Sequence, residues 1–135
     1  METEKLLEEA KIAREKAYAP YSNFSVGAAL ATKSGKIFTG SNIENASYGL
    51  TNCAERTAIF KAVSEGEREF AALLVVADTK TPVSPCGACR QVMAEFCPPE
   101  MPVYLANMDG KITQTTVEQL LPNAFKSEDM EDAGE

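Results

Sequence analysis

Two cysteines three residues apart are the clearest chemical feature of the sequence. In Cys86-Gly87-Ala88-Cys89 the thiols occupy positions i and i+3, which on a helix places their Cβ atoms on one face about 5–6 Å apart. Such a pair can share a metal ion. A Cys-x-x-Cys at the start of a helix that follows a buried strand is also typical of thioredoxin-like oxidoreductases, so this motif alone favours neither interpretation.

A third cysteine favours the metal. Cys53 begins another predicted helix, and a carboxylate, Glu55, follows two residues later. A closed structural zinc site needs four ligands, whereas a catalytic site keeps one position open for water. We therefore predict an open zinc site formed by Cys53, Cys86 and Cys89. Cys97 follows the second helix, and we expect it to be a small buried residue and not a fourth ligand.

The sequence contains no histidine, and this excludes several kinds of active site. Serine and cysteine nucleophiles activated by histidine, histidine general bases and His-x-x-x-His zinc sites are all ruled out. Acid and base catalysis must then fall to carboxylates, and Glu55 is the candidate beside the metal. An acidic residue in the first turn of a helix also simply stabilises the helix, which is the alternative role for Glu55.

Three thiolates on Zn²⁺ leave a net negative charge, which opposes ionisation of a bound water. Two features can offset that charge. Both cysteine-bearing helices would point their N-terminal ends at the metal, and Arg56 lies three residues after Cys53 on the same helical face. We expect Arg56 to donate hydrogen bonds to the thiolates; the alternative is a solvated surface arginine.

The elements that must position these residues alternate between helices and strands. A helix carrying Leu6, Ala10, Ala13 and Ala17 is expected to end at Pro20, and a second, capped by Asn52, covers 53–64. The apolar run 70–77 indicates a strand buried on both faces. An α/β domain with a mixed sheet follows. The remaining predictions are a hairpin (25–32 and 36–42), a loop (45–52), a helix (86–96), a strand (101–106), an edge strand after 107–110 and a terminal helix (117–121).

Length and charge place the chain among single-domain proteins. Its 135 residues are 44% apolar, so residues 1–126 are expected to form one domain. The net charge is −7, but residues 127–135 hold five acidic residues, which leaves 13 basic against 15 acidic residues elsewhere. We expect a solvated, disordered tail at 127–135. A body of charge −2 lacks the clustered basic residues that nucleic-acid binding requires.

The compartment is predicted from what the sequence lacks. The chain opens Met-Glu-Thr-Glu, with no basic and apolar leader, and no apolar run approaches the ~18 residues of a bilayer-spanning helix. We therefore expect no membrane association and a cytoplasmic protein with free thiolates.

Several motifs together resemble a known family. Cys53-Ala54-Glu55, followed by Pro85-Cys86-Gly87-Ala88-Cys89, resembles the zinc-dependent cytidine deaminases in their all-cysteine form, and is closest to the short homotetrameric enzymes. The resemblance covers nearly the whole chain and leaves out only the acidic tail. Its other segments are Ala19-Pro20-Tyr21-Ser22, residues 24–30, residues 42–45 and residues 120–125.

This resemblance implies a three-layer α/β/α fold with a mixed sheet of about five strands, one Zn²⁺ per subunit and a homotetramer. It implies hydrolytic deamination of cytidine and deoxycytidine to uridine and deoxyuridine with release of ammonia, as in pyrimidine salvage. Zinc lowers the pKa of bound water toward ~7. The amino group leaves only after protonation, so Glu55 would carry the proton from the water to the ring nitrogen and then to the amine.

The resemblance also implies the contacts with the nucleoside. Asn42 and Glu44 have the i, i+2 spacing that points two side chains the same way from an extended segment. By themselves they are ordinary polar residues at a strand end; the family implies that they bind the ribose 3′-hydroxyl. The backbone of Ala54 and Ser84 would recognise the edge of the base.

Aromatic residues complete the implied site. Phe24 and Phe125 would each stack on the pyrimidine, although core packing is the more ordinary role for such side chains. Phe125, together with Tyr48, would reach into the pocket of a neighbouring subunit. In that case the site is complete only in the assembled oligomer.

Three alternatives stay open at this point. The same chemistry could act on other aminated bases, on blasticidin-like antibiotics or on bases within nucleic acid. A thiol oxidoreductase using Cys86 and Cys89 would hold no metal, and it leaves the placement of Cys53 beside Glu55 unexplained. A zinc-stabilised binding module would hold zinc without turnover.

Overall fold

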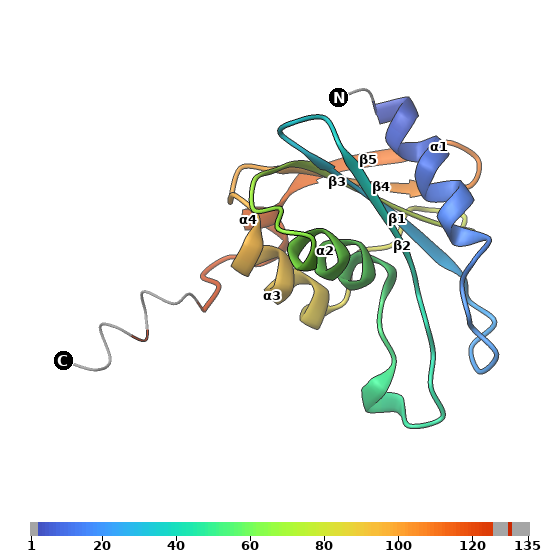
Figure 1. Ribbon diagram of the computed structural model, residues 1–135. Coiled ribbons are helices and arrows are strands. Elements are labelled where there is room, and N and C mark those ends of the chain that lie inside the picture. The colour runs from blue at the N-terminus through green and yellow to red at the C-terminus, as the bar shows by residue number, and fades with distance from the viewer. Residues whose placement is uncertain (1–2, 126–129, 131–135) are drawn as a thin grey trace.

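One mixed sheet of five strands organises the chain. In the computed structural model, which describes residues 3–125 and Met130, the strand order is β2-β1-β3-β4-β5 (Figure 1). β3 and β4 run parallel, and the other neighbouring strands run antiparallel. The predicted mixed sheet is thereby confirmed. The strands are β1 (Val26–Thr32), β2 (Ile37–Ser41), β3 (Phe70–Ala77), β4 (Pro102–Asn107) and β5 (Ile112–Thr116).

Helices cover both faces of this sheet, which gives the three layers predicted (Figure 1). Helix α1 lies on one face, where its apolar side packs against alternate residues of β3 such as Leu74. Helices α2 and α3 lie on the other face, where they cover residues such as Leu73. Leu73 and Leu74 face different helices because neighbouring residues of a strand point to opposite faces of the sheet. The helices are α1 (Thr3–Arg14), α2 (Ala54–Ser64), α3 (Gly87–Phe96) and α4 (Val117–Leu120), with a 3₁₀ turn, η1 (Tyr48–Leu50).

The central strand β3 leads the chain toward the predicted site. Its residues are buried apart from half-buried Ala71, as the continuous apolar run predicts. After Ala77 the chain enters a loop that ends at the start of α3. Val26, the first residue of β1, pairs with Ala77, so the loop before β1 lies at the same end of the sheet.

Helix α2 rests directly on β2 because Gly40 has no side chain. A Cβ atom at Gly40 would lie 2.5 Å from the carbonyl oxygen of Ala54 and 2.5 Å from the amide nitrogen of Ala58. Gly27 plays the same part beneath α1, where a Cβ would lie 2.0 Å from the carbonyl oxygen of Ala10. The close approach at Gly40 fixes the height above the sheet of the helix that carries Glu55.

The first helix ends earlier than the sequence predicts. Leu6, Ala10 and Ala13 are buried as expected, but α1 ends at Arg14 and does not reach Pro20. The chain leaves the helix because Tyr18 pairs with the segment after β2: its amide donates to the Asn42 carbonyl (3.0 Å) and its carbonyl accepts from the Glu44 amide (2.8 Å). Tertiary pairing therefore overrides the helical pattern.

The predicted cap of the second helix is also wrong. Cys53, and not Asn52, occupies the N-cap of α2, with extended backbone angles. Asn52 lies one residue earlier, where its backbone pairs with Ile43 and its side-chain amide donates to Thr57 Oγ1 (3.1 Å). Asn52 therefore braces the first turn of α2 from the side.

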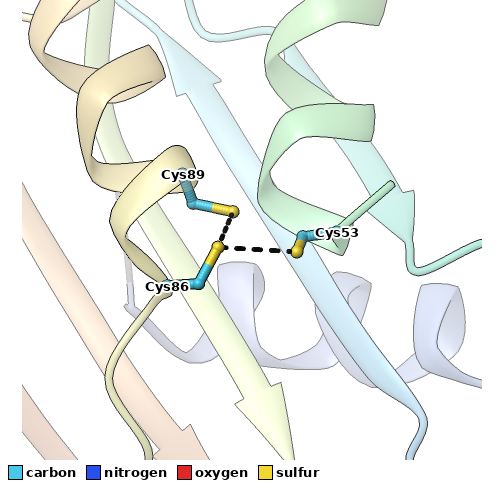
Figure 2. Close-up of side chains that lie close together, drawn as sticks. All are labelled: Cys53, Cys86 and Cys89. Carbon is cyan, nitrogen blue, oxygen red and sulfur yellow. Dashed lines mark hydrogen bonds between the residues drawn. The ribbon is translucent and has the colours of Figure 1, made fainter. Parts of the chain in front are cut away.

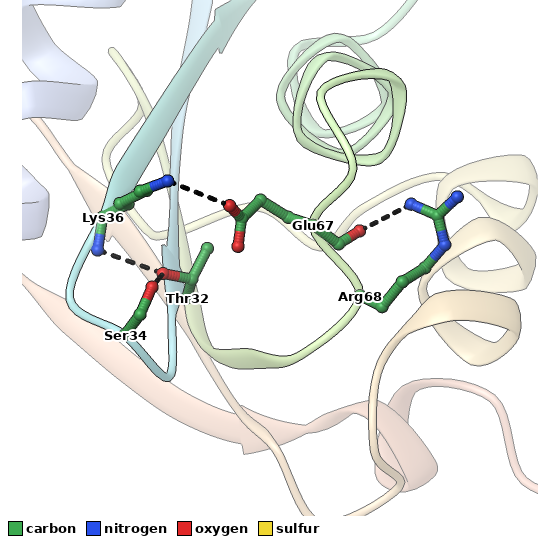
Figure 3. Close-up of polar contacts among 5 residues, drawn as sticks. All are labelled: Thr32, Ser34, Lys36, Glu67 and Arg68. Carbon is green, nitrogen blue, oxygen red and sulfur yellow. Dashed lines mark hydrogen bonds and ion pairs between the residues drawn. The ribbon is translucent and has the colours of Figure 1, made fainter.

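A polar cluster lies at the end of the sheet opposite the end where β3 leads toward the predicted site. It joins the β1–β2 turn to the connection between α2 and β3 (Figure 3). Thr32 Oγ1 accepts from the Lys36 amide (3.0 Å) and lies 2.9 Å from Ser34 Oγ. Lys36 Nζ forms an ion pair with Glu67 (3.3 Å), and Arg68 donates to the Glu67 carbonyl. Exposed ion pairs of this kind contribute little stability, so the cluster mainly fixes the turn.

Among residues 3–125 and Met130, no helix has both the length and the apolar character needed to cross a bilayer. Apart from Met130, the predicted acidic tail at 127–135 lies outside the described residues.

Candidate active site

Three cysteine sulfurs meet where the N-terminal ends of α2 and α3 come together (Figure 2). Cys86 Sγ lies 3.8 Å from Cys53 Sγ and 3.4 Å from Cys89 Sγ, and all three sulfurs lie within 4.8 Å of one another. Cys53 is half-buried, Cys86 exposed and Cys89 buried. The three residues that the sequence predicts as zinc ligands therefore form one cluster.

Local helix geometry turns these sulfurs toward one another. Cys53 and Cys86 are the N-cap residues of α2 and α3, yet neither side chain bonds an amide of its own helix. An N-cap side chain normally accepts such a bond, so both sulfurs are left free for another partner. Both helix N-termini also direct their partial positive charge at the cluster.

The cluster fits a zinc ion in its chemistry and its spacing. Thiolate sulfur is a preferred ligand of Zn²⁺, and Zn–S bonds of about 2.3 Å in a tetrahedral arrangement put the sulfurs about 3.8 Å apart. The sulfur separations of 3.4 and 3.8 Å need only small adjustments to reach that value. Three protein ligands leave one tetrahedral position for water or substrate.

Arg56 supplies a positive charge beside these sulfurs. Its Nη2 donates to Cys53 Sγ over 3.3 Å, while its Nε is buried and has no hydrogen-bond partner among the described residues. The bond to Cys53 raises the pKa of the guanidinium. The close contact with Cys89 lowers the pKa of Cys53 to about 5, with a further contribution from the hydrogen bond of Arg56. The same contact raises the pKa of Cys89.

Cys97 stands apart from this cluster. It follows the last residue of α3 and is buried, and burial raises its pKa to about 12. A thiol that stays protonated in an apolar site behaves as a small hydrophobic residue, as the sequence predicts.

A pocket of about 320 Å³ opens beside the cluster. It lies between the loop before β1, the segment after β2, the start of α2 and the loop that leads into α3. Cys89, Arg56 and Phe125 are not among the residues that line it. The other predicted site residues all line the pocket; they are Phe24, Asn42, Glu44, Tyr48, Cys53, Ala54, Glu55, Ser84 and Cys86.

Glu55 is the buried acid of this pocket. It belongs to the first turn of α2, two residues after Cys53, and only 4% of its surface is exposed. Burial is the main cause that raises its pKa to about 7, and the neighbouring Cys53 thiolate adds to the rise. A carboxyl group with a pKa near the working pH can both release and accept a proton.

Asn42 and Glu44 hold the loop that carries Phe24. The Asn42 side chain donates to the Phe24 carbonyl (2.8 Å) and accepts from the Val26 amide (2.9 Å). Glu44 Oε1 accepts from the amides of Tyr21 (3.0 Å) and Ser22 (3.1 Å), and Glu44 Oε2 accepts from Ser22 Oγ. The Ser22 hydroxyl is the main cause that lowers the pKa of Glu44.

The two aromatic residues expected to reach a neighbouring subunit, Tyr48 and Phe125, differ from each other in their position relative to this chain's pocket. Tyr48 lines this chain's own pocket and is 88% exposed. Phe125 lies on the surface after α4, 59% exposed, where Gln91 Nε2 of α3 donates to its carbonyl (3.0 Å). The single chain therefore does not bring Phe125 into its own pocket.

Sequence reasoning missed part of the pocket wall. Nothing in the sequence around Val75 of β3 or Val83 of the following loop indicates that they line a pocket. Only the tertiary arrangement brings them to the pocket wall. Ser22 lies within a segment covered by the family resemblance, yet nothing about an isolated serine marked it. The lining residues missed are Ser22, Val26, Thr51, Asn52, Val75, Val83 and Pro85.

Comparisons with known proteins agree with this geometry. Residues 1–105 match the family model described as the cytidine and deoxycytidylate deaminase zinc-binding region. A cytidine deaminase of Sporosarcina psychrophila is 64% identical over 100% of this chain and 99% of its own. One from Halalkalibacterium halodurans is also 64% identical, over 98% of this chain and 100% of its own.

A solved structure extends the match to three dimensions. The crystal structure of cytidine deaminase from Burkholderia pseudomallei aligns with a TM-score of 0.90 at 60% identity, and the alignment covers 93% of this chain and 100% of that one. With its three-cysteine cluster, its buried glutamate and these full-length matches, the chain belongs to the zinc-binding cytidine and deoxycytidylate deaminase family.

Proposed function

We propose that the protein catalyses the hydrolytic deamination of cytidine and deoxycytidine to uridine and deoxyuridine, with release of ammonia. One observation carries the proposal: a buried carboxyl group, Glu55, lies beside a three-cysteine cluster at the wall of a pocket of about 320 Å³. The full-length relatives named cytidine deaminase support the same reaction.

Cys53, Cys86 and Cys89 would hold the zinc ion. When bound there, zinc lowers the pKa of water and so supplies a nucleophile at neutral pH that can attack C4 of the cytosine ring. The exposed Cys86 and the half-buried Cys53 both line the pocket, so substrate in the pocket would reach a metal held by these residues.

Glu55 moves the proton. Its carboxylate would take one proton from the attacking water and give it to N3 of the ring. The regenerated carboxylate would then take the second proton, from the new hydroxyl on C4, and deliver it to the departing amino group. Water is added at C4, ammonia leaves, and Glu55 ends in its starting state. The buried position and the raised pKa of about 7 support this role, because the group exchanges protons readily near neutral pH.

Arg56 compensates the charge of the thiolates. Its bond to Cys53, and its buried Nε that has no partner within the described part of the chain, place a cation beside sulfurs that carry negative charge when they bind a metal. This charge compensation favours ionisation of the water without adding a proton donor to the pocket.

Asn42 and Glu44 would bind the sugar. An ionised carboxylate offers about four acceptor positions, and three of those on Glu44 are taken by Tyr21 and Ser22. One position, on Oε2, is left for a substrate hydroxyl. Glu44 can therefore hold one sugar hydroxyl, the 3′-hydroxyl, and not a vicinal pair, which supports equal use of cytidine and deoxycytidine.

The base would be held by Phe24 and by the backbone of Ala54 and Ser84, all of which line the pocket. Phe24 is 40% exposed, which leaves an aromatic surface available for stacking.

We also propose a homotetramer whose subunits complete one another's sites. Phe125 is exposed and lies outside its own pocket, while Tyr48 and Leu50 of η1 are 88% and 71% exposed on a loop that extends from the body of the chain (Figure 1). Exposed apolar side chains of this size are typical of contact surfaces between subunits.

The setting we propose is pyrimidine salvage in the cytoplasm, without nucleic acid as partner. The four cysteines are all unpaired, as a reducing compartment favours. Residues 1–126 would act as one domain, since β1, β3 and β4 contribute to both core clusters.

A substrate panel tests the proposed function. Zinc-replete protein is mixed separately with cytidine, deoxycytidine, free cytosine, blasticidin S and a single-stranded oligonucleotide rich in deoxycytidine, and products are followed by ultraviolet absorbance and chromatography. We expect turnover of the two nucleosides at similar rates and little of the others. Turnover of another compound alone would move the assignment to that substrate, and no turnover at all would favour the binding module.

A further inference from the structure

The loop that brings Phe24 to the pocket has little packing to hold it. Residues 21–24 are all exposed. Asn23 adopts a left-handed conformation, with φ of 57°, and its amide donates to the Ala19 carbonyl (3.0 Å). The position of Phe24 therefore depends on hydrogen bonds to neighbouring segments.

One hydroxyl group connects the two parts of the pocket assigned to base and sugar. Ser22 Oγ donates to Glu44 Oε2, and it accepts from the Phe24 amide over 3.1 Å. A serine hydroxyl has one hydrogen to donate and can accept at the same time, so both contacts coexist. Glu44 follows β2 and Phe24 precedes β1, yet through Ser22 they form one connected unit.

The distance between these two residues matters for a nucleoside. Its base and sugar are joined by a single glycosidic bond, so a stacking surface and a hydroxyl acceptor must keep a fixed separation. Asn42 holds Phe24 through backbone groups but makes no bond to Glu44 within the described chain. The Ser22 hydroxyl is the side-chain contact that couples the two.

We propose that Ser22 is a positioning residue for the nucleoside, whose hydroxyl sets the Phe24 aromatic surface and the Glu44 carboxylate in register for base and sugar. This inference rests on the proposed function. Ser22 donates no hydrogen bond to α2 or α3 among the described residues, so it acts on substrate binding and not on the groups that carry out the chemistry.

Kinetics of three variants test the inference. Ser22→Ala removes the hydroxyl; we expect KM for cytidine to rise about tenfold, the effect of losing one hydrogen bond to a charged group, with kcat within about twofold of the parent. Ser22→Thr keeps the hydroxyl, and the exposed position leaves room for the added methyl group. This variant should therefore keep KM for cytidine close to that of the parent. Ser25→Ala is the matched control, because the Ser25 side chain makes no hydrogen bond in the described structure and does not line the pocket.

Binding of uridine, measured by calorimetry, gives a readout independent of turnover, and Ser22→Ala should weaken it by the same factor as KM. An unchanged KM, a fall in kcat alone, a Thr variant as poor as the Ala variant, or loss of cooperative unfolding in Ser22→Ala would overturn the inference. A parent without turnover would refute the proposed function, and the role of Ser22 with it. An active parent with an unaffected Ser22→Ala would refute the role of Ser22 alone.

Discussion

Arg56 lies one helical turn after Cys53 on α2, and its Nη2 donates a hydrogen bond to the Cys53 sulfur over 3.3 Å. A predicted metal ligand and the cation proposed to offset its charge thus lie at the N-cap and in the first turn of one helix. Because the helix fixes the spacing of the two residues, the proposed charge compensation is built into α2.

Removing this charge should weaken the metal site. We expect Arg56→Gln to stay folded but to lose about 10- to 100-fold in zinc affinity or in activity, the usual effect of losing a partner of a metal ligand. Competition with a chromogenic chelator measures the affinity. Arg68→Gln is the matched control, since Arg68 bonds backbone carbonyls at the other end of α2. If Arg56→Gln equalled the parent in zinc affinity and in activity, Arg56 would be an ordinary surface arginine with no role at the metal site.

Two buried cysteines should respond differently to substitution. We expect Cys89→Ser to bind zinc far more weakly, because it removes one of the three sulfurs of the cluster. Cys97→Ala should keep one zinc per chain, because Cys97 lies outside the cluster. Metal content after dialysis against a weak chelator distinguishes them. Equal loss of zinc from both variants would mean that the ligand set is assigned wrongly.

Gly40→Ala should displace α2. The added methyl would lie 2.5 Å from backbone atoms of Ala54 and Ala58, and relief requires the helix to move away from β2. We expect a loss of about 1–3 kcal/mol in the free energy of unfolding, with reduced kcat because Glu55 moves with the helix. Gly49→Ala is the control, because among the described residues no atom beyond the neighbours of Gly49 in the chain lies within 4 Å of the added carbon. Urea unfolding that gives the same stability for both variants would contradict this packing.

Stability should depend on pH through Glu44. Its folded-state pKa lies below the ordinary value of 4.5, mainly because Ser22 donates to it, so the carboxylate stabilises the folded state above that pH. This stabilisation is lost as pH falls through the folded pKa. We expect the parent to be more stable than Glu44→Gln at pH 7, and the difference to shrink below pH 4.5. A difference that stays constant from pH 7 to pH 3 would exclude this linkage.

The cysteine cluster could be predicted from sequence because its information is local. Cys86 and Cys89 share one helical face by spacing alone, and Cys53 stands at the start of another helix of the right kind. The buried strand β3 was predictable for a similar reason, since a continuous apolar run needs cover on both faces.

The rest depends on contacts between distant segments. The end of α1 at Arg14 is set by pairing of Tyr18 with Ile43, and Val75 reaches the pocket wall only through the order of the strands. The hydrogen bonds that Ser22 donates to Glu44 also join residues that are 22 positions apart. No spacing rule within one element reports such contacts.

The role of Glu55 is the central claim, and one comparison tests it most directly. Parent and Glu55→Gln are prepared side by side, zinc per chain is measured, and conversion of cytidine to uridine is followed on the same samples. We predict that the variant keeps its zinc but loses about 10²–10⁴-fold in kcat, because the amide cannot carry the proton. A zinc-loaded Glu55→Gln within tenfold of the parent would contradict the mechanism.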